Sequence, residues 1–382
     1  MKKRIIASII STVLAAIGLC GCAASGYAVY NPQTVFSDDI LFNARMLGGN
    51  TAKAHKRMCE IIEQIDAQVS VTRENSDIAR FNAAGAGERV EVGAYAYELF
   101  NTSLEYYTLT DGAFNCAASP LATLWHVDAA GLSELTRGDD GERINDALPT
   151  ADEVKETLSY CDPNSVIAES ENGKYYLTKS DARTKLDFGG IAKGYAVDKC
   201  VEVFEECGVA SALIDISGNM YAYGEYMLSA DGKWNIGVTS PRPRVTLSRG
   251  VLCALSLSGD ESAVTSGDYM RYYRCDAYDT PVYVTHIIGR DGVPIGVTAD
   301  GDGWKNTDEL VVSATVIGGS SAVCDVLSTS VCVLGLEGGA KLLQKVGYKG
   351  LIFTEKRYTI IGEVSLYKPD EYDEHKAYEY VP

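Results

Sequence analysis

The spacing of apolar residues along the chain predicts helices mixed with groups of adjacent strands. Between Thr51 and Val69, apolar side chains recur at helical spacing, at Met58, Ile61, Ile62, Ile65 and Val69, which indicates an amphipathic helix. We expect further helices over 92–109, 151–160, 192–207 and 321–334. We expect short strands over 174–177, 212–217, 233–239, 251–259, 285–289, 310–318 and around 351–361. Helices mixed with largely adjacent strands predict an α+β layered fold rather than a regular βαβ succession.

The N-terminus follows a different pattern. Lys2, Lys3 and Arg4 precede an almost wholly apolar run to Leu19, which is typical of a secretion signal and too short for a transmembrane helix. The run ends in Leu-Cys-Gly-Cys at 19–22, the order of a bacterial lipobox. We therefore expect lipidation at Cys22 and a lipid anchor on the extracytoplasmic face of the bacterial cell membrane, with a soluble secreted protein as the alternative.

The chain then divides by composition. We expect a signal peptide over 1–21, a tether over 22–40 that lacks helical periodicity, and a single catalytic domain with two closely joined lobes over 41–367. A charged, Tyr-rich tail follows over 368–382, and we expect it to be loose.

Charge and cysteine content exclude several classes of protein. A net charge of −18 argues against binding to nucleic acid or to anionic lipid surfaces. Of the 11 cysteines, Cys20 and Cys22 belong to the signal region, and 11 − 2 leaves an odd nine with no C-x-x-C pair. Buried thiols therefore fit better than a disulfide framework. The four histidines are widely spaced, which gives no support to a Cys/His zinc site.

The segment TKLDFGGIAKGYAVD, from Thr184 to Asp198, suggests a phosphate-binding turn. It predicts a short strand, a Gly189-Gly190 turn and a helix with an early lysine, Lys193. A helix N-terminus presents unpaired N–H groups and a positive dipole end, and both favour phosphate. An ordinary strand-to-helix turn is the plainer interpretation of the same pattern.

A second candidate site lies in SSAVCDVLSTS, at 320–330. Asp325 and Thr329 are four residues apart and therefore share one face of a helix. A carboxylate with a neighbouring hydroxyl can hold Mg²⁺, whose other ligands are water, phosphate or a carbonyl oxygen. A polar helix face or a cap is the alternative. His286, on a predicted apolar strand, is by itself better explained as a core histidine than as a catalyst.

Eight segments, taken together, resemble one family. Their order along the chain is MLGGNT (46–51), SDIARFN (76–82), DGAFNCAASPLATLW (111–125), KLDFGGIAKGYAVD (185–198), ISGN (216–219), TSGDY (265–269), HIIGRDGVP (286–294) and CDVLST (324–329). This order is similar to that of the bacterial FAD:protein FMN transferases, the ApbE family. The resemblance implies an ApbE-like, T-fold-related layered α+β domain that extends from Met46 to the strands near Ile361.

The resemblance also implies an activity. In that family, FAD is cleaved at its pyrophosphate, and FMN is transferred through a phosphoester to a Thr or Ser of a partner flavoprotein. AMP is released and Mg²⁺ is required.

Site residues are implied position by position. Asp325, Thr329 and the carbonyl of Gly190 would bind the metal. Asp187, Lys193 and Ser328 would contact FAD near it. The adenosine and flavin pocket would be lined by Met46, Ala113, Phe114 and Asn115, with His286 and Ile288 nearby. The proton of the acceptor hydroxyl needs a base, and the sequence leaves His286 and Asp268 as alternatives.

The chain departs from the family pattern at several positions. Asn115 replaces the usual Asp, Ser217 replaces the first Gly of Gly-Gly-Asn, and Thr72 replaces an aromatic residue. Gly289-Arg290 stands where the family usually has Asp-Pro. Two alternative functions follow: a Mg²⁺-dependent FAD pyrophosphatase with water as acceptor, and a non-catalytic FAD-binding lipoprotein. Retention of Asp325 and Thr329 favours an enzyme.

Overall fold

The computed structural model describes residues 28–35, 41–128, 131, 136–138, 141–144, 148–241, 250–307, 309–368, 370–371 and 373–382. The predicted signal peptide and Cys22 lie outside the described residues, as do residues 23–27 and 36–40 of the predicted tether. The prediction of a tether is wrong for Val29–Tyr30 and Gln33–Val35, which are short strands paired with Leu41–Leu47. The nine cysteines within the described residues are free thiols. The prediction of thiols in place of a disulfide framework is therefore confirmed for this part of the chain.

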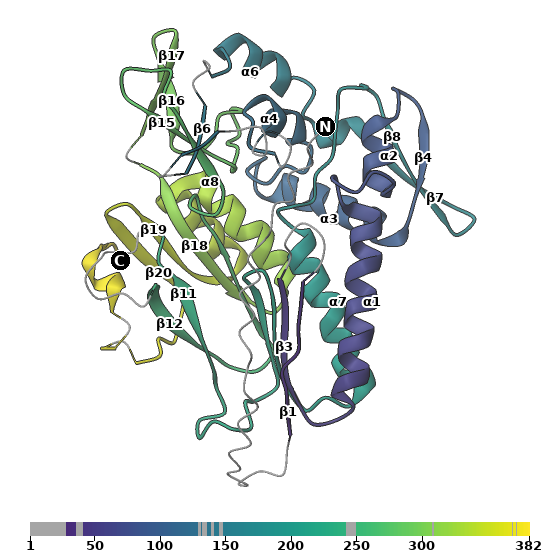
Figure 1. Cartoon of the computed structure of the whole chain (residues 1–382), viewed down its shortest axis with the longest axis vertical. Coiled ribbons are helices and arrows are strands. Elements are labelled where there is room, and N and C mark those ends of the chain that lie inside the picture. The colour runs from purple at the N-terminus through teal and green to yellow at the C-terminus, as the bar shows by residue number, and fades with distance from the viewer. Residues whose placement is uncertain are drawn as a thin grey trace, which may run out of the picture.

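A ten-stranded sheet forms the centre of the fold (Figure 1). Its strand order is β1 (Val29–Tyr30), β3 (Leu41–Leu47), β9 (Ser211–Ile216), β10 (Asn219–Tyr223), β13 (Glu261–Ser266), β18 (Val311–Gly318), β19 (Lys349–Thr354), β20 (Arg357–Ile361) and β21 (Glu379–Tyr380), with β2 (Gln33–Val35) beside β3. Neighbouring strands pair antiparallel, except that β20 and β21 are parallel.

Three helices cover one face of this sheet, namely α1 (Thr51–Val69), α7 (Ala192–Cys207) and α8 (Ser321–Val346). In Figure 1, α1 and α7 run side by side next to β3, and α8 lies against β18. Side chains along β3 alternate between the two faces of the sheet. Phe42, Ala44 and Met46 therefore lie in the core beneath the helices, whereas Leu47 lies on the opposite face. There the hairpin of β11 (Trp234–Thr239) and β12 (Val251–Leu257) covers the sheet.

Helix α8 extends beyond the predicted helix over 321–334. It is interrupted at Gly335, whose φ of 74° and ψ of 179° are not helical, and it then continues to Val346. By length and composition alone, α8 could cross a membrane. More than half of its most apolar window is buried inside the protein, so we assign it as the core helix of this fold.

Two smaller groups of elements complete the described fold. One is a three-stranded sheet with two helices, made of β4 (Arg89–Val92), β7 (Val166–Glu171), β8 (Lys174–Lys179), α2 (Asp77–Ala83) and α3 (Ala94–Leu109), with the 3-10 turn η2 (Pro163–Ser165). The other contains α4 (Ser119–Leu124), α6 (Ala151–Leu158), a sheet of β5 (Thr136–Gly138), β6 (Gly141–Ile144), β14 (Tyr272–Cys275) and β15 (Val282–Thr285), and the hairpin of β16 (Val297–Asp300) and β17 (Gly303–Asn306).

Two further predicted elements differ from the structure. The helix expected over 92–109 starts at Ala94, because Arg89–Val92 pairs with β8 as strand β4. The strand expected over 285–289 is wrong beyond Thr285. Its chain enters a turn in which the Gly289 N–H donates to the Val293 carbonyl at 2.7 Å, and Ile288 contributes only an isolated bridge to Pro294.

The expectation of a loose C-terminal tail is wrong for residues 373–382. The segment forms the 3-10 turn η3 (Glu374–Ala377) and strand β21, which pairs with β20. Tyr378 is 5% exposed, and its ring packs edge-on against Phe353 with centroids 5.4 Å apart. Tyr378 therefore acts as an apolar anchor of a tail that was predicted to be loose.

Candidate active site

The N-termini of α7 and α8 meet at Gly194. A Cβ atom at this position would lie 2.3 Å from the Ser321 carbonyl oxygen, so only glycine permits this approach. The contact brings the first turn of α7, which carries Lys193, next to Asp325 in the second turn of α8. The two sequence motifs that suggested phosphate and metal binding are therefore neighbours in space.

Asp325 is the most buried charged group of this junction, with 3% of its surface exposed. Its Oδ2 accepts the Gly194 N–H at 3.1 Å and lies 3.5 Å from Lys193 Nζ. Burial raises the pKa of the Asp325 carboxyl, and the Lys193 charge and the Gly194 N–H oppose that rise. Lys193 Nζ also donates to the Gly189 carbonyl at 2.8 Å. In this conformation the positive charge at the N-terminus of α7 is paired with the Asp325 carboxylate.

Three hydroxyl groups lie beside Asp325. Ser328 Oγ is 2.7 Å and Thr329 Oγ1 is 3.3 Å from Ser266 Oγ, which belongs to β13. Ser328 Oγ also donates to the Asp325 carbonyl at 3.0 Å. Ser266 was not among the predicted site residues, although its hydroxyl-rich turn TSGDY was noted in the sequence.

Gly190 completes this group from the α7 side. A Cβ atom placed on it would lie 3.6 Å from Thr329 Oγ1 and 3.1 Å from Phe114 Cε2. The backbone of Gly190 is thus a neighbour of Thr329, and Asp325 lies one helical turn before Thr329 on α8. Together the three residues offer a carboxylate, a hydroxyl and a carbonyl. These hard oxygen donors are of the kind that Mg²⁺ prefers. The described residues contain no group of three or more His, Cys, Asp or Glu side chains that could by themselves hold a metal ion, so the remaining ligands would be phosphate or water.

Asp187 lies in the turn before α7. Its Oδ1 accepts the Gly189 N–H at 2.7 Å. The side chain of Asn82 makes two hydrogen bonds to Leu186, the residue before Asp187. Its Oδ1 accepts the Leu186 N–H at 2.7 Å, and its Nδ2 donates to the Leu186 carbonyl at 2.8 Å. Lys179, 1% exposed, donates to the Thr184 carbonyl at 2.9 Å. No local pattern of residues indicates Lys179, and Asn82 was noted only within a family segment.

The 113–115 segment borders the same turn. Ala113 and Phe114 are buried, and the Phe114 N–H donates to Thr110 Oγ1 at 3.0 Å. Asn115 Nδ2 donates to the Cys161 carbonyl at 2.9 Å, and its Oδ1 accepts the Ala117 N–H at 2.8 Å. Both ends of the Asn115 amide are thus used inside the fold, and an aspartate could not make the first of these bonds.

His286 lies within electrostatic reach of Lys193. Its Nδ1 is 3.0 Å from the Arg271 carbonyl. Because a carbonyl only accepts, Nδ1 carries the proton in the neutral ring and Nε2 keeps a lone pair. Burial, assisted by the charges of Arg271 and Lys193, lowers the pKa of His286 to about 4. Asp268 is 4% exposed and lies near Cys332. Cys332 follows Ser328 by one helical turn of α8.

Other predicted residues lie apart from this junction. Met46 is fully buried in the core beneath α1 and α7. Ile288 packs against the core of the α4–α6 group. Ser217 and Gly218 have φ values of 48° and 91° and form the two-residue turn between β9 and β10. Ser217 Oγ accepts the Leu41 N–H at 2.9 Å. The turn therefore contributes a hydrogen bond to strand β3 of the central sheet.

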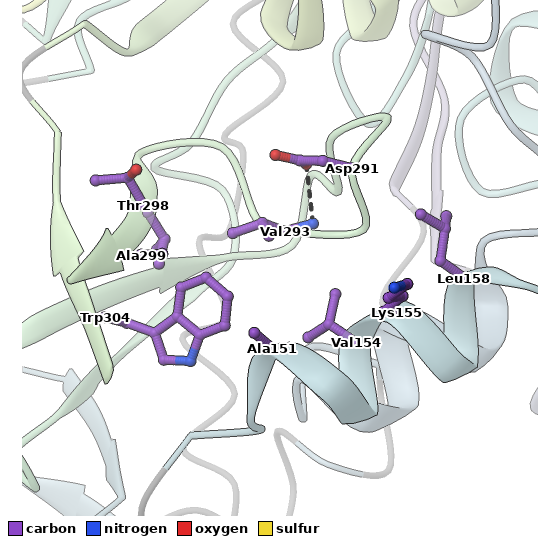
Figure 2. A pocket seen from close by; sticks show the side chains of 10 residues that line it. Ala151, Val154, Lys155, Leu158, Asp291, Val293, Thr298, Ala299 and Trp304 are labelled. Atoms are coloured by element: carbon purple, nitrogen blue, oxygen red, sulfur yellow. Dashed lines mark hydrogen bonds between the residues drawn. The ribbon is translucent and has the colours of Figure 1, made fainter. Parts of the chain in front are cut away.

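A cavity of about 410 Å³ lies elsewhere, between α6 and the β16–β17 hairpin. Figure 2 shows the α6 side chains facing Trp304 across it, with Asp291 bonded to the Val293 N–H. Its lining residues are Ala151, Val154, Lys155, Leu158, Asp291, Val293, Val297, Thr298, Ala299 and Trp304. None of them is a predicted site residue, so we do not assign the proposed chemistry to this cavity.

Comparison with solved structures identifies the fold. The chain resembles the flavinyl transferase ApbE of Pseudomonas stutzeri in its apo form, with a TM-score of 0.68 and 24% identity over 92% of this chain and 98% of that chain. It also resembles the ApbE protein of Thermotoga maritima, with a TM-score of 0.68 and 23% identity over 90% and 98% of the two chains. The predicted layered α+β, ApbE-like fold is confirmed.

The chain belongs to the ApbE family, whose family model matches residues 33–352. A relative from Treponema pallidum (strain Nichols), named FAD:protein FMN transferase, is 30% identical over 322 residues, 80% of this chain and 79% of its own length. Another of the same name, from Klebsiella pneumoniae (strain 342), is 27% identical over 306 residues, 80% and 83% of the two lengths.

Proposed function

We propose that the protein is an FAD:protein FMN transferase. FAD is the substrate, and the acceptor is a flavoprotein with an exposed Ser or Thr. FMN becomes joined to that hydroxyl through a phosphoester, and AMP is released. The observation that carries the proposal is the junction of Lys193, Asp325 and Thr329 at the N-termini of α7 and α8, in a chain of the ApbE family.

The reaction needs positive charge around a pyrophosphate and a proton acceptor near the incoming hydroxyl. The acceptor oxygen attacks the phosphorus on the flavin side, and the bond from that phosphorus to the bridging oxygen breaks. AMP leaves with the bonding electron pair. Lys193 and the N-terminal end of α7 supply positive charge for the phosphate oxygens. Asp325, Thr329 and the Gly190 carbonyl would hold Mg²⁺, which when bound supplies further positive charge to the pyrophosphate.

We assign the proton transfer to His286. Its Nε2 lone pair is available in the neutral ring, and its low pKa keeps the ring neutral at pH 7. Asp268, the alternative base, is almost wholly buried, which limits its contact with an acceptor protein.

The test is incubation with FAD, Mg²⁺ and a candidate acceptor, followed by the intact mass of the acceptor and chromatography of AMP. We expect the acceptor to gain one FMN for each AMP formed. Asp325→Ala should abolish both products, because the site has a single carboxylate ligand, whereas Asp152→Ala on the exposed surface of α6 should leave both unchanged. AMP and free FMN without acceptor modification would favour the FAD pyrophosphatase instead.

We further propose that the protein is anchored to the bacterial cell membrane by lipid at Cys22, on the extracytoplasmic face. The support is the Leu-Cys-Gly-Cys order directly after a short apolar run. We predict that Cys22→Ala releases the protein into the medium or leaves the signal segment uncleaved. Membrane fractionation with mass spectrometry of the N-terminal peptide measures this, and a variant still processed and retained at the membrane would contradict the anchor.

A further inference from the structure

The N-terminus of α8 is capped by a side chain of α7. Asp198 Oδ1 accepts the Ser321 N–H at 2.7 Å. Its Oδ2 accepts the Ala322 N–H at 3.0 Å and the Ser320 hydroxyl at 2.7 Å. The Val323 N–H is bonded by Ser320 Oγ at 3.3 Å. Asp198 therefore binds the first two amides of a helix that is distant from it in sequence.

This cap is one half of a reciprocal arrangement. Asp198 stands in the second turn of α7 and binds the start of α8, while Asp325 stands in the second turn of α8 and binds the Gly194 N–H near the start of α7. The Gly194 contact holds the two helices at the crossing between these bonds. Cys324 lies within electrostatic reach of both carboxylates, which contribute to the raised pKa of its thiol.

The position of Asp325 relative to Lys193 depends on this arrangement. Asp325 follows the capped amides of α8 by only three residues, so a frayed first turn would displace its carboxylate. The carboxylate cannot adjust freely, because it is buried between the two helices. Within the described part of the chain, the hydrogen bonds of Asp198 go to the start of α8, and none of them involves the hydroxyl groups of Ser266, Ser328 or Thr329.

We propose that Asp198 is a positioning residue for the cation site at Asp325. It fixes the first turn of α8 on α7 and thereby sets Asp325 at the place where it can bind a divalent cation. The inference rests on the proposed function, since it takes Asp325 as the carboxylate ligand of that reaction. Removal of the cap should weaken cation binding even where the fold survives.

The experiment measures Mn²⁺ binding to the mature, FAD-free protein by electron paramagnetic resonance, together with the melting temperature. We expect Asp198→Ala to weaken Mn²⁺ binding by about 10- to 100-fold, the usual range for groups that orient a ligand. Asp198→Asn keeps one acceptor oxygen and should lie between this variant and the parent. Thr150→Ala removes the cap of α6; it should lower the melting temperature and leave Mn²⁺ affinity unchanged.

One outcome would contradict the inference: both Asp198 variants bind Mn²⁺ within twofold of the parent but melt at a lower temperature. Asp198 would then be a structural cap with no role in cation binding. If Asp198→Ala does not fold, Asp198→Asn decides the question alone. Asp325→Ala provides the reference: Mn²⁺ binding that survives it would overturn the inference, because the ion then binds elsewhere. A parent that binds Mn²⁺ through Asp325 but transfers no FMN would defeat the proposed function and leave the role of Asp198 intact.

Discussion

At the scale of single residues, Asn115 shows how one side chain is fitted to this particular chain. The carboxamide donates to the Cys161 carbonyl and accepts the Ala117 N–H. A carboxylate could keep only the second bond and would set a negative charge against the Cys161 oxygen. The hydrogen bond to the Cys161 carbonyl therefore explains why this chain has asparagine at position 115. The substitution does not have to be explained by a loss of activity.

We predict that Asn115→Asp destabilises the protein by about 1–3 kcal/mol at pH 7, the cost of an unpaired, partly buried polar group. Urea denaturation measures it. Asn101→Asp is the matched control, because Asn101 Nδ2 makes the same kind of bond, to the Tyr97 carbonyl, on an exposed surface. Equal effects of the two substitutions would contradict the explanation.

His286 supplies a pH dependence. Its pKa is lowered from 6.5 to about 4 in the folded protein, so the unfolded chain takes up this proton first as pH falls. Its contribution to stability is therefore complete above pH 6.5 and is lost as pH falls toward 4. As the proposed base, neutral His286 should also sustain transfer well below pH 6.5.

The acid limb of kcat/KM, which reports the free enzyme, is expected near pH 4 rather than near 6.5. Proton NMR titration of the His286 ring measures the pKa directly, with His286→Gln to assign the signal. A ring that titrates near 6.5 would contradict both expectations.

Prediction of the site from sequence depended on spacing within one helix. Asp325 and Thr329 could be paired because a four-residue spacing places them on one face of a helix. Asn82, Lys179 and Ser266 could not be found in this way, because each bonds to a segment that is distant in sequence: Asn82 to Leu186, Lys179 to the Asn82 carbonyl, and Ser266 to Ser328.

At the scale of elements, helix boundaries were predictable where a local stop signal exists. Helix α7 ends at Cys207 as expected, because Gly208 takes a left-handed conformation with φ of 65°. The predicted end of α8 at 334 coincides with its interruption at Gly335. The segment after the interruption was missed because its glycine pair at 338–339 obscures the apolar spacing.

Gly335 allows a test that separates backbone strain from crowding. A Cβ atom there would meet nothing within 4 Å, yet φ is +74°. Gly335→Ala should therefore destabilise the protein through backbone conformation alone, by about 1–3 kcal/mol. Gly319→Ala, equally free of neighbours but without a positive φ, should change the free energy of unfolding little. Comparable urea midpoints for the two variants would mean that α8 can straighten at Gly335.

At the scale of the whole molecule, the layered α+β class was predictable but the sheet order was not. Strand β3 pairs with β9, more than 160 residues further along the chain, and β10 pairs with β13 across the inserted β11–β12 hairpin. Such pairings leave no mark in local periodicity. The prediction for the C-terminal tail was wrong for the same reason, since Tyr378 and Tyr380 pack against Phe353 and Tyr358, which belong to other strands.

That tail has a consequence for how copies of the protein behave toward one another. Without residues 373–382, β20 would be the edge strand of the central sheet. Backbone groups that now bond to the tail, such as the Tyr358 carbonyl that accepts the Val381 N–H, would then be unpaired. Exposed borders of this kind recruit strands from other molecules. We predict that a chain truncated after residue 372 self-associates, as light scattering coupled to gel filtration would show. An extension beyond Pro382 should change the molecular mass only by the mass of the added residues. A monomeric truncated chain would mean that the border is protected in another way.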